Sequence, residues 1–190
     1  MPRRSGGSAL LAMVATASMS NELSPARLKG MNGFPQKIVS GGQTGADRAA
    51  LDFSIEHGIS HGGWCPRGRK AEDGRIDGRY QLKETPSSIY VLRTERNVRD
   101  SDGTVVFSIV AVLTGESKRA VELARKHEKP CLHLSATSDR DKAAGLLREF
   151  IRQHGIKVLN VAGPRGSQAP GVAEFVTATL TKALPPHEAA

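Results

Sequence analysis

The segment KIVSGGQTGAD, residues 37–47, carries the residue types best suited to binding an anion. Gly41, Gly42 and Gly45 allow the backbone to bend tightly and to approach a ligand with no Cβ in the way. A helix that begins at Thr44 or Gly45 would direct free N–H groups at a bound oxygen, which favours a phosphate within a nucleotide-like molecule. The segment fits neither the Rossmann nor the Walker glycine pattern, and a purely structural turn is the alternative.

Three side chains add to the chemistry of this segment. Gln43 and Thr44 can donate hydrogen bonds to a bound oxygen. Asp47 falls in the first turn of the helix, where it either complements the helix dipole and caps its own backbone or contacts the ligand. If the protein is an enzyme, Asp47 is one of two candidate catalytic acids.

A second candidate turn, LTGESKRA, spans residues 113–120 and leads from an apolar run into a helix. Thr114, Gly115 and Ser117 are its candidates for contact with an anion. Glu116 is the second candidate catalytic acid. It either lies at the N-terminal end of the helix as a capping acid or acts on a sugar.

A third turn, NVAGPRGSQAPG, spans residues 160–171 and follows the last apolar run directly. Its candidate ligand contacts are Gly163, Arg165 and Ser167. The planar fork of an arginine suits bidentate contact with phosphate, and the flanking glycines give access to it. Arg165 is therefore the residue that we most expect to touch an anion.

The segment HGGWCPRGRKAEDGR, which begins at His61, is too long for a simple connector. Trp64 could stack on a heterocycle while Arg67 meets a phosphate; the alternative is a surface loop whose tryptophan seals the core. Cys65, His57 and His61 lack partners at metal-site spacing. We therefore expect no metal held by protein ligands.

Strand-like runs and helical patterns alternate from Ile38 onward, as in βαβ units around a parallel sheet. This layout predicts an α/β fold, a Rossmann-like three-layer sandwich with a mostly parallel central sheet. Ligands in such folds bind beyond the carboxyl ends of the strands, so the three turns should meet there. The predicted strands after the first are VVFSIVAVL at 105–113, CLHL at 131–134 and residues 157–161. A helix should follow each strand, with a further helix at about 87–99 and a long irregular insertion at 62–79.

The composition is that of an ordinary globular chain, with 190 residues, 38% hydrophobic content and a mean hydropathy of -0.33. We expect one ligand-binding domain over residues 35–184. A disordered extension at 1–34 and a short tail at 185–190 would flank it. The extension imitates a weak export or transit signal, and a translation start near Met31 is the alternative.

Part of the formal net charge of +8 lies in residues 1–34, and the remainder suits an anionic ligand as well as a polynucleotide. Aromatic residues make up 4% of the chain, too few for a platform that stacks single-stranded bases. No apolar run is long enough to span a membrane. The 2 cysteines exclude a disulfide framework and favour a reducing compartment, the cytoplasm.

Five segments together resemble the molybdenum carrier family, whose members are relatives of molybdenum cofactor carrier proteins. They are KIVSGGQTGADRAALDFSIEHG, GGWCPRGRKAEDGRI, NVRDSDGT, LARKHEKPCLHL and LNVAGPRGSQAPG. The match runs from about Lys37 to Leu180. It implies a Rossmann-like fold shared with lysine-decarboxylase-like (LONELY GUY) phosphoribohydrolases and, more distantly, with DNA-processing proteins of natural transformation.

By this resemblance the ligand is molybdenum cofactor (molybdopterin), a pterin with a dithiolene-bound metal and a terminal phosphate. The protein would bind and deliver it without covalent attachment, and the metal would arrive with the cofactor. A homo-oligomer is expected, with molybdenum enzymes or their insertion machinery as partners. The residues that would hold the oxyanions are Gly41, Gly42, Gln43, Thr44, Gly45 and Arg165, and those that would flank the pterin are Trp64 and Arg67.

The chain departs from the family pattern at the second turn. The family turn is usually glycine-glycine-threonine, whereas this chain has Gly115, Glu116 and Ser117. An acid there would repel a phosphate unless it faces away. The phosphoribohydrolases carry a proline-glycine-glycine turn followed by a glutamate, and this chain has no clean copy of it.

Three functions are compatible with these residues. The favoured one is a binding and carrier protein for a phosphorylated pterin. The second is an enzyme that cleaves the N-glycosidic bond of a nucleoside monophosphate, with Glu116 or Asp47 near the ribose. The third and weakest is a binder of single-stranded nucleic acid.

Overall fold

The computed structural model describes residues 34–184. The expectations for residues 1–33 and for the tail at 185–190 lie outside the described residues. Phe34, which the sequence assigns to the extension, is partly buried against the main core. The core therefore reaches at least to this residue.

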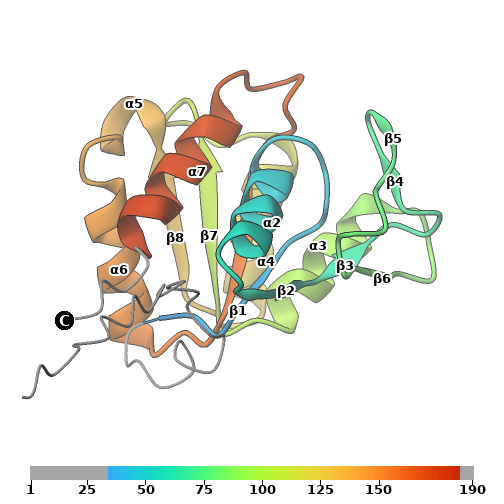
Figure 1. Cartoon of the computed structure of the whole chain (residues 1–190), viewed down its shortest axis with the longest axis horizontal. Helices are drawn as coiled ribbons and strands as arrows, with labels where there is room; N and C mark the ends of the chain where they lie inside the picture. The colour runs from blue at the N-terminus through green and yellow to red at the C-terminus, as the bar shows by residue number, and fades with distance from the viewer. Residues whose placement is uncertain (1–33, 185–190) are drawn as a thin grey trace, which may run out of the picture.

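The central sheet has five parallel strands in the order β2-β1-β9-β7-β8. They are β1 (Lys37–Val39), β2 (Ser60–Gly62), β7 (Gly103–Ser108), β8 (Cys131–Ser135) and β9 (Val158–Ala162). Strand β9 lies between β1 and β7, so the loops that follow these three strands emerge together at the carboxyl edge of the sheet (Figure 1). The predicted α/β sandwich is confirmed.

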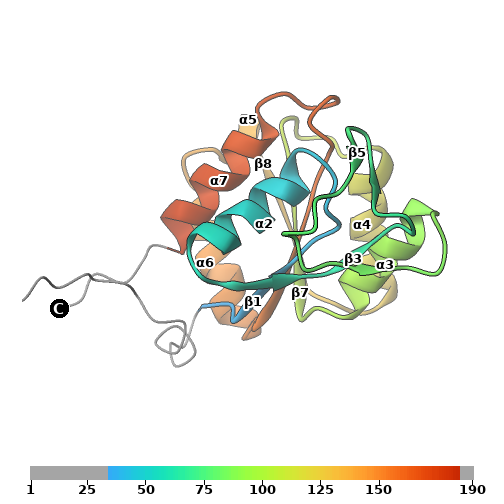
Figure 2. The same ribbon diagram turned by 45° about the vertical axis from the view of Figure 1, so that its right-hand side comes forward.

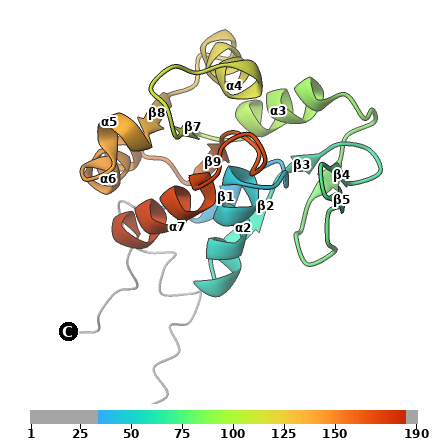
Figure 3. The same cartoon turned by 90° about the horizontal axis from the view of Figure 1, so that it is seen from above.

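Helices cover both faces of this sheet, as the view from above shows (Figure 3). One face carries α2 (Ala46–Glu56), α6 (Ala143–His154) and α7 (Val172–Ala183). The other carries α3 (Tyr90–Arg99) and α4 (Gly115–Lys126), while α5 (Ala136–Asp139) is a single turn after β8. The apolar face of α6 supplies its buried residues, Ala143, Leu147, Phe150 and Ile151, whereas Leu146 is exposed.

Strand β7 is shorter than its apolar run suggests. All six of its residues are buried, because it lies between β8 and β9 under helices on both faces. The chain leaves the sheet after Ser108, and the rest of the predicted run forms a loop in which Val110 and Val112 are exposed. A continuous apolar run does not reveal where its strand stops when the following loop is also apolar.

The insertion at 62–79 is more ordered than predicted. It contributes β3 (Trp64–Cys65), β4 (Lys70–Ala71) and β5 (Gly74–Arg75), and β6 (Lys83–Glu84) pairs with β3 just beyond it. The side chain of Arg69 donates hydrogen bonds to four main-chain carbonyls between residues 76 and 82, which closes the segment on itself. Its small apolar core consists of Leu51, Cys65, Ile76, Tyr80 and Leu82.

The β4–β5 hairpin reaches back toward the carboxyl edge of the sheet. In Figure 2 it lies beside the loop that follows β9. Arg48 of α2 forms an ion pair with Asp73 of the hairpin. The insertion is thus positioned next to the loops that the sequence selects as a site.

Gly45 is the glycine whose identity the packing restricts most clearly. Its φ is 77°, and a Cβ there would lie 2.7 Å from the carbonyl oxygen of Pro164 and from the amide nitrogen of Gly166. Both obstacles are main-chain atoms, which cannot rotate away as a side chain can.

Gly45→Ala is expected to lower the free energy of unfolding by about 3 kcal/mol, since it combines a positive φ with overlap against backbone. The matched control is Gly58→Ala, which also has a positive φ, 63°, but nothing within 4 Å of the added Cβ. For that variant we expect a loss of about 1 kcal/mol. Urea unfolding followed by circular dichroism measures both, and equal losses would contradict the packing role of Gly45.

Candidate ligand-binding site

The loops after β1, β7 and β9 meet around a cavity of about 540 Å³. This confirms the expectation that three distant segments converge at the carboxyl edge of the sheet. Helix α3 closes one side with Arg93, a residue that none of the three turns contains. The candidate residues that line the cavity are Gln43, Thr114, Gly115, Glu116, Ser117, Gly163 and Arg165.

The N-terminus of α4 opens into this cavity. Thr114 precedes the helix in an extended conformation and makes no side-chain cap. Among residues 34–184, no acceptor receives the amide protons of Gly115, Glu116 or Ser117. Free first-turn amides and the helix dipole together favour an anion at this position.

The N-terminus of α2 is occupied by the protein itself. The amide of Gln43 donates to Asp47 Oδ2 at 3.2 Å, and the amide of Thr44 donates to the side chain of Gln43 at 3.0 Å. Ala46 N donates to the carbonyl of Pro164 at 3.4 Å. At these three positions the expectation of free N–H groups is wrong, because side chains and a neighbouring loop serve as their acceptors.

The glycines of this first loop make room for other parts of the chain. A Cβ on Gly41 would collide with the guanidinium of Arg93, and one on Gly42 would lie 2.5 Å from a methyl group of Leu82. Gly163 of the third loop allows close approach to Ala46, whose Cβ would be 2.5 Å away. Packing therefore explains glycine at these sites without a ligand.

Arg93 and Asp47 form a buried ion pair beside the cavity. Their N–O distance is 2.9 Å, and only 9% and 6% of the two side chains are exposed. Burial raises the pKa of Asp47, while the positive charge of Arg93 and the amide of Gln43 act in the opposite direction. With its carboxylate engaged in this way, Asp47 is built into the wall rather than presented to a substrate.

Sequence reasoning missed Arg93. A signal was present, because Asn97 lies four residues after Arg93 and three after Thr94, which places the three polar residues in a stripe on one side of the helix. The structure shows that this stripe is buried against the sheet edge. A buried polar stripe on a helix is a stronger indication of a site than an exposed one.

Three buried side-chain atoms have no hydrogen-bond partner within residues 34–184, and all three belong to residues that line this cavity. They are Nε2 of Gln43, Nε of Arg93 and Oε2 of Glu116. Buried polar atoms in folded proteins are nearly always paired, so such a concentration indicates partners supplied from outside the chain. Two of the atoms donate and the third accepts.

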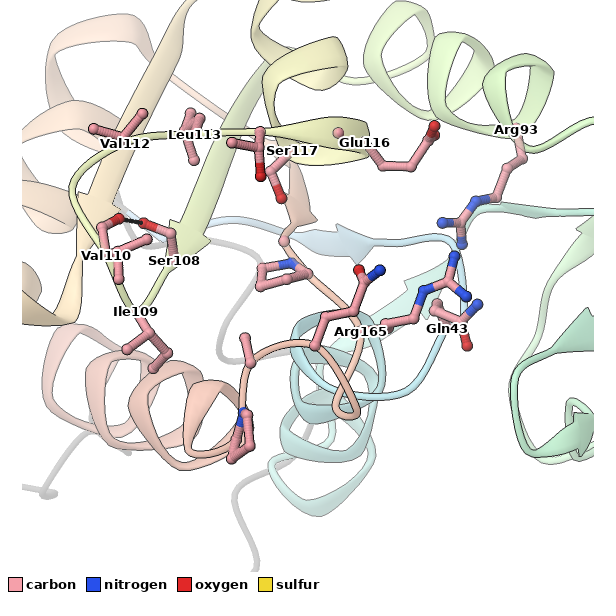
Figure 4. A pocket seen from close by; sticks show the side chains of 17 residues that line it. Gln43, Arg93, Ser108, Ile109, Val110, Val112, Leu113, Glu116, Ser117 and Arg165 are labelled. Atoms are coloured by element: carbon pink, nitrogen blue, oxygen red, sulfur yellow. Dashed lines mark hydrogen bonds between the residues drawn. The ribbon is translucent and has the colours of Figure 1, made fainter.

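Figure 4 shows how these side chains point. The guanidinium groups of Arg93 and Arg165 face each other, Gln43 lies beside Arg165, and Glu116 extends from α4 toward Arg93. Both guanidinium groups also lie against the ring of Tyr90, at 5.5 and 6.0 Å from its centroid. Arg165 is 31% exposed and is therefore the more accessible cation of the two.

The opposite wall is formed by the end of β7 and the loop after it. The hydroxyl of Ser108 donates to the carbonyl oxygen of Val110 at 2.6 Å (Figure 4). It also lies 2.7 Å from Nε2 of His133. Burial lowers the pKa of His133. Beyond Ser108 the wall is apolar, with Ile109, Val112 and Leu113 facing the cavity. The site thus has a polar end and an apolar end.

Thr44 and Ser167 lie just outside the cavity, around the side chain of Glu72. The hydroxyl groups of both residues contact the carboxylate of Glu72, and the amide of Ser167 donates to it at 3.3 Å. The amide of Gly166 donates to the hydroxyl oxygen of Thr44 at 3.1 Å. These hydrogen bonds lower the pKa of Glu72, the Ser167 hydroxyl having the largest effect.

Trp64 and Arg67 lie apart from the cavity. The indole N–H of Trp64 donates to Asp100 at 2.8 Å, and Arg96 stacks on the ring at 4.4 Å. Trp64 lines a separate hollow of about 190 Å³, and Arg67 is exposed on the insertion. The structure thus does not bring these two residues together with the three turns, because the short strand β3 carries Trp64 against α3 instead.

Within the described part of the chain, no three histidine, cysteine or carboxylate side chains are grouped as metal ligands would be. Burial raises the pKa of Cys131 to about 11, so its thiol is a poor nucleophile and a poor soft ligand. No helix in this part of the chain is both long and apolar enough to cross a bilayer.

The model of the circularly permutated YpsA SLOG family matches residues 38–184. The chain belongs to this family. It is also similar to a solved structure from Syntrophus aciditrophicus named "Putative molybdenum carrier protein", with 48% sequence identity and a TM-score of 0.76. That match covers 79% of this chain and 95% of the other. No curated protein matches the chain.

The match spans all of the central sheet except the first residue of β1, together with all three turns of this YpsA SLOG family member. The sequence prediction of a molybdenum carrier-like protein is therefore confirmed at the level of the family.

Asp47→Asn is expected to lower the free energy of unfolding by about 3–5 kcal/mol, because it leaves the charge of Arg93 buried without a counter-ion. The double variant with Arg93→Met should lose less than the sum of the two single changes, since it removes both charges. Denaturant unfolding of the four proteins in this cycle measures the coupling.

The control for that cycle is Glu149→Gln, which breaks the exposed ion pair with Arg152 at 2.6 Å. It should leave stability unchanged within error, because solvent screens exposed pairs. Strict additivity of Asp47→Asn and Arg93→Met would show that the buried pair does not act as a unit.

Proposed function

We propose that this protein binds a phosphorylated, ring-containing small molecule without covalent attachment, and that molybdenum cofactor is that ligand. The observation that carries the proposal is the set of three unpartnered buried atoms at one cavity. Nε2 of Gln43 and Nε of Arg93 require acceptors, which phosphate oxygens provide. Oε2 of Glu116 requires a donor, which an N–H of a pterin or a hydroxyl group provides.

The shape of the cavity supports such a ligand. Its volume of about 540 Å³ is within the usual range for small-molecule sites. The anion would lie at the polar end, between the N-terminus of α4 and the guanidinium of Arg165. The ring system would lie along Ile109 and Leu113 at the apolar end. The sequence alone assigns this role to Trp64, which lies apart from the cavity.

The similarity to the Syntrophus aciditrophicus protein supports a molybdenum-related cargo. Any metal in the cargo would be held by the cargo itself, since among residues 34–184 the side chains that line the cavity include a single carboxylate, Glu116, and no histidine or cysteine. Delivery to molybdenum enzymes or to their insertion machinery, a homo-oligomeric state and a cytoplasmic location complete the proposal. The free thiols of Cys65 and Cys131 are consistent with a reducing compartment.

Arg165→Gln is expected to weaken the binding of molybdenum cofactor by about 10- to 100-fold, the usual effect of losing a charge-assisted contact to phosphate. Anaerobic titration of the purified protein with cofactor released from a molybdenum enzyme, followed by fluorescence of the oxidised pterin, measures this. Arg152→Gln makes the same charge change at an exposed site remote from the cavity and should bind as the wild type does.

A complementary measurement uses protein purified from its native cells under cofactor-replete conditions. Oxidation, pterin fluorescence and mass spectrometry should then recover a phosphorylated pterin. Recovery of none, or an Arg165→Gln variant that binds as tightly as the wild type, would contradict the proposal.

One observation favours a second candidate, an enzyme that cleaves the N-glycosidic bond of a nucleoside monophosphate. Glu116 presents a buried carboxylate oxygen without a partner in the cavity, whereas Asp47 is engaged by Arg93 and Gln43. Glu116 is therefore the acid of this alternative. The hypothesis of single-stranded nucleic-acid binding gains no comparable support from the described residues.

If that alternative holds, incubation with AMP should release free adenine, and Glu116→Gln should reduce the release at least 100-fold by removing the acid. Liquid chromatography of the products measures the reaction. The control is Glu122→Gln on the exposed face of α4, away from the cavity. No release from any nucleoside monophosphate by the wild type would eliminate the enzyme and leave the binding protein.

A further inference from the structure

The carboxylate of Glu72 lies where a bound anion would be expected. It projects from the β4–β5 hairpin and is held by the hydroxyl of Thr44, by the hydroxyl and amide of Ser167, and by the nearby guanidinium of Arg165. All four donors belong to three residues whose types and spacing point to phosphate binding, Thr44, Arg165 and Ser167. Glu72 itself comes from a different segment, the insertion.

The contacts form a connected set rather than a chance approach. The amide of Gly166 donates to the hydroxyl of Thr44, which in turn contacts Glu72, so each bond polarises the next. Only 18% of the Glu72 side chain is exposed. The distance from Arg165 Nε to Glu72 Oε2, 3.9 Å, is too long for a hydrogen bond, so Arg165 is held less firmly than the hydroxyl groups are.

Arg165 connects this cluster with the cavity. Arg165 lines the cavity, and its guanidinium also approaches the carboxylate of Glu72. A guanidinium presents five donors, and a dianionic phosphate competes for them more strongly than a carboxylate does. An anion that enters the cavity beside Arg165 therefore competes with the Glu72 carboxylate for the guanidinium of Arg165.

We propose that Thr44, Arg165 and Ser167 form an oxyanion subsite at the rim of the cavity, in which the Glu72 carboxylate is an internal substitute that a phosphate group of the ligand displaces. The ligand class is a phosphomonoester or a similar tetrahedral oxyanion. This inference deepens the proposed function and rests on it.

The hairpin has the anchors that such a displacement requires. β4 and β5 pair with each other, and the main-chain amide of Glu72 donates to the side chain of Gln43 at 3.0 Å. Both contacts can persist when the Glu72 side chain rotates outward, since neither involves its carboxylate. The rotation frees two hydroxyl groups and one amide for the incoming anion without unfolding the hairpin.

The test is a titration of the full chain with inorganic phosphate, followed by amide chemical shifts in ¹⁵N-labelled protein. The amides of Glu116 and Ser117 report on the N-terminus of α4, and the amide of Ser167 reports on the subsite. Wild type, Glu72→Gln and Asp73→Asn are compared. Asp73→Asn removes the same charge from the next residue, whose carboxylate contacts Arg48 and none of the subsite donors.

In Glu72→Gln, phosphate should saturate the Ser167 shift with a Kd at least about tenfold below that of the wild type, because the competing charge is gone. Asp73→Asn should match the wild type. Glutamine keeps an oxygen acceptor for Ser167, and an amide spectrum as well dispersed as that of the wild type verifies folding.

An unchanged or higher Kd in Glu72→Gln would overturn the inference, since Glu72 would then position Arg165 instead of competing for it. In that case, phosphate-dependent shifts at Glu116 and Ser117 would still support the proposed function. The absence of shifts at these two amides in all three proteins would count against the proposed function itself. A lowered Kd at Ser167 in Asp73→Asn as well would also overturn the inference, because the effect would then be one of general charge.

Discussion

The buried ion pair between Arg93 and Asp47 is the interaction on which the rest of the site depends. It joins α3 and the first turn of α2, which cover opposite faces of the sheet, across the carboxyl edge where the strands end. Two charges can remain in such a place only if both are paired and hydrogen-bonded, and Asp47 meets this condition by also accepting from the amide of Gln43. The pair in turn requires glycine at position 41, since a Cβ there would take the space of the guanidinium.

The pair also explains which side chains are left to a ligand. Arg93 uses Nη1 for Asp47, which holds its Nε buried without a partner beside the cavity. Gln43 uses its oxygen for the amides of Thr44 and Glu72, which leaves its amide nitrogen free. Because Arg93 and Gln43 are each fixed by hydrogen bonds on one side, the donors left unpaired on the other side, among the described residues, are Arg93 Nε and Gln43 Nε2. This is the preorganisation that a binding site needs, because the protein has already ordered these donors before a ligand arrives.

The sequence predicted the parallel α/β sandwich and the meeting of three loops, one of which carries Arg165, because apolar runs and glycine turns follow local rules. The role of the glycine loop could not be predicted in the same way. Glycine at 41, 42 and 45 has the same appearance whether the neighbour is a phosphate or another part of the chain, and here the neighbours are Arg93, Leu82 and the loop at 163–166. The sequence also placed Trp64 at the ligand and missed Arg93. Tertiary packing decides which face of a short strand or of a polar helix reaches the carboxyl edge of the sheet.

Under the proposed function, the carboxylates near the cavity are compatible with an anionic ligand. Glu116 extends toward Arg93 and the Glu72 carboxylate lies 3.9 Å from Arg165, so a simple anion gains little net attraction on entry. A ligand that bears an anion and also a hydrogen-bond donor for Glu116 satisfies both kinds of group, whereas inorganic phosphate leaves the acid without a partner. The acids therefore increase discrimination between ligands while they reduce affinity. For the proposed carrier, which would release what it binds, that is the more useful balance, because a site made only of cations would bind phosphates without discrimination.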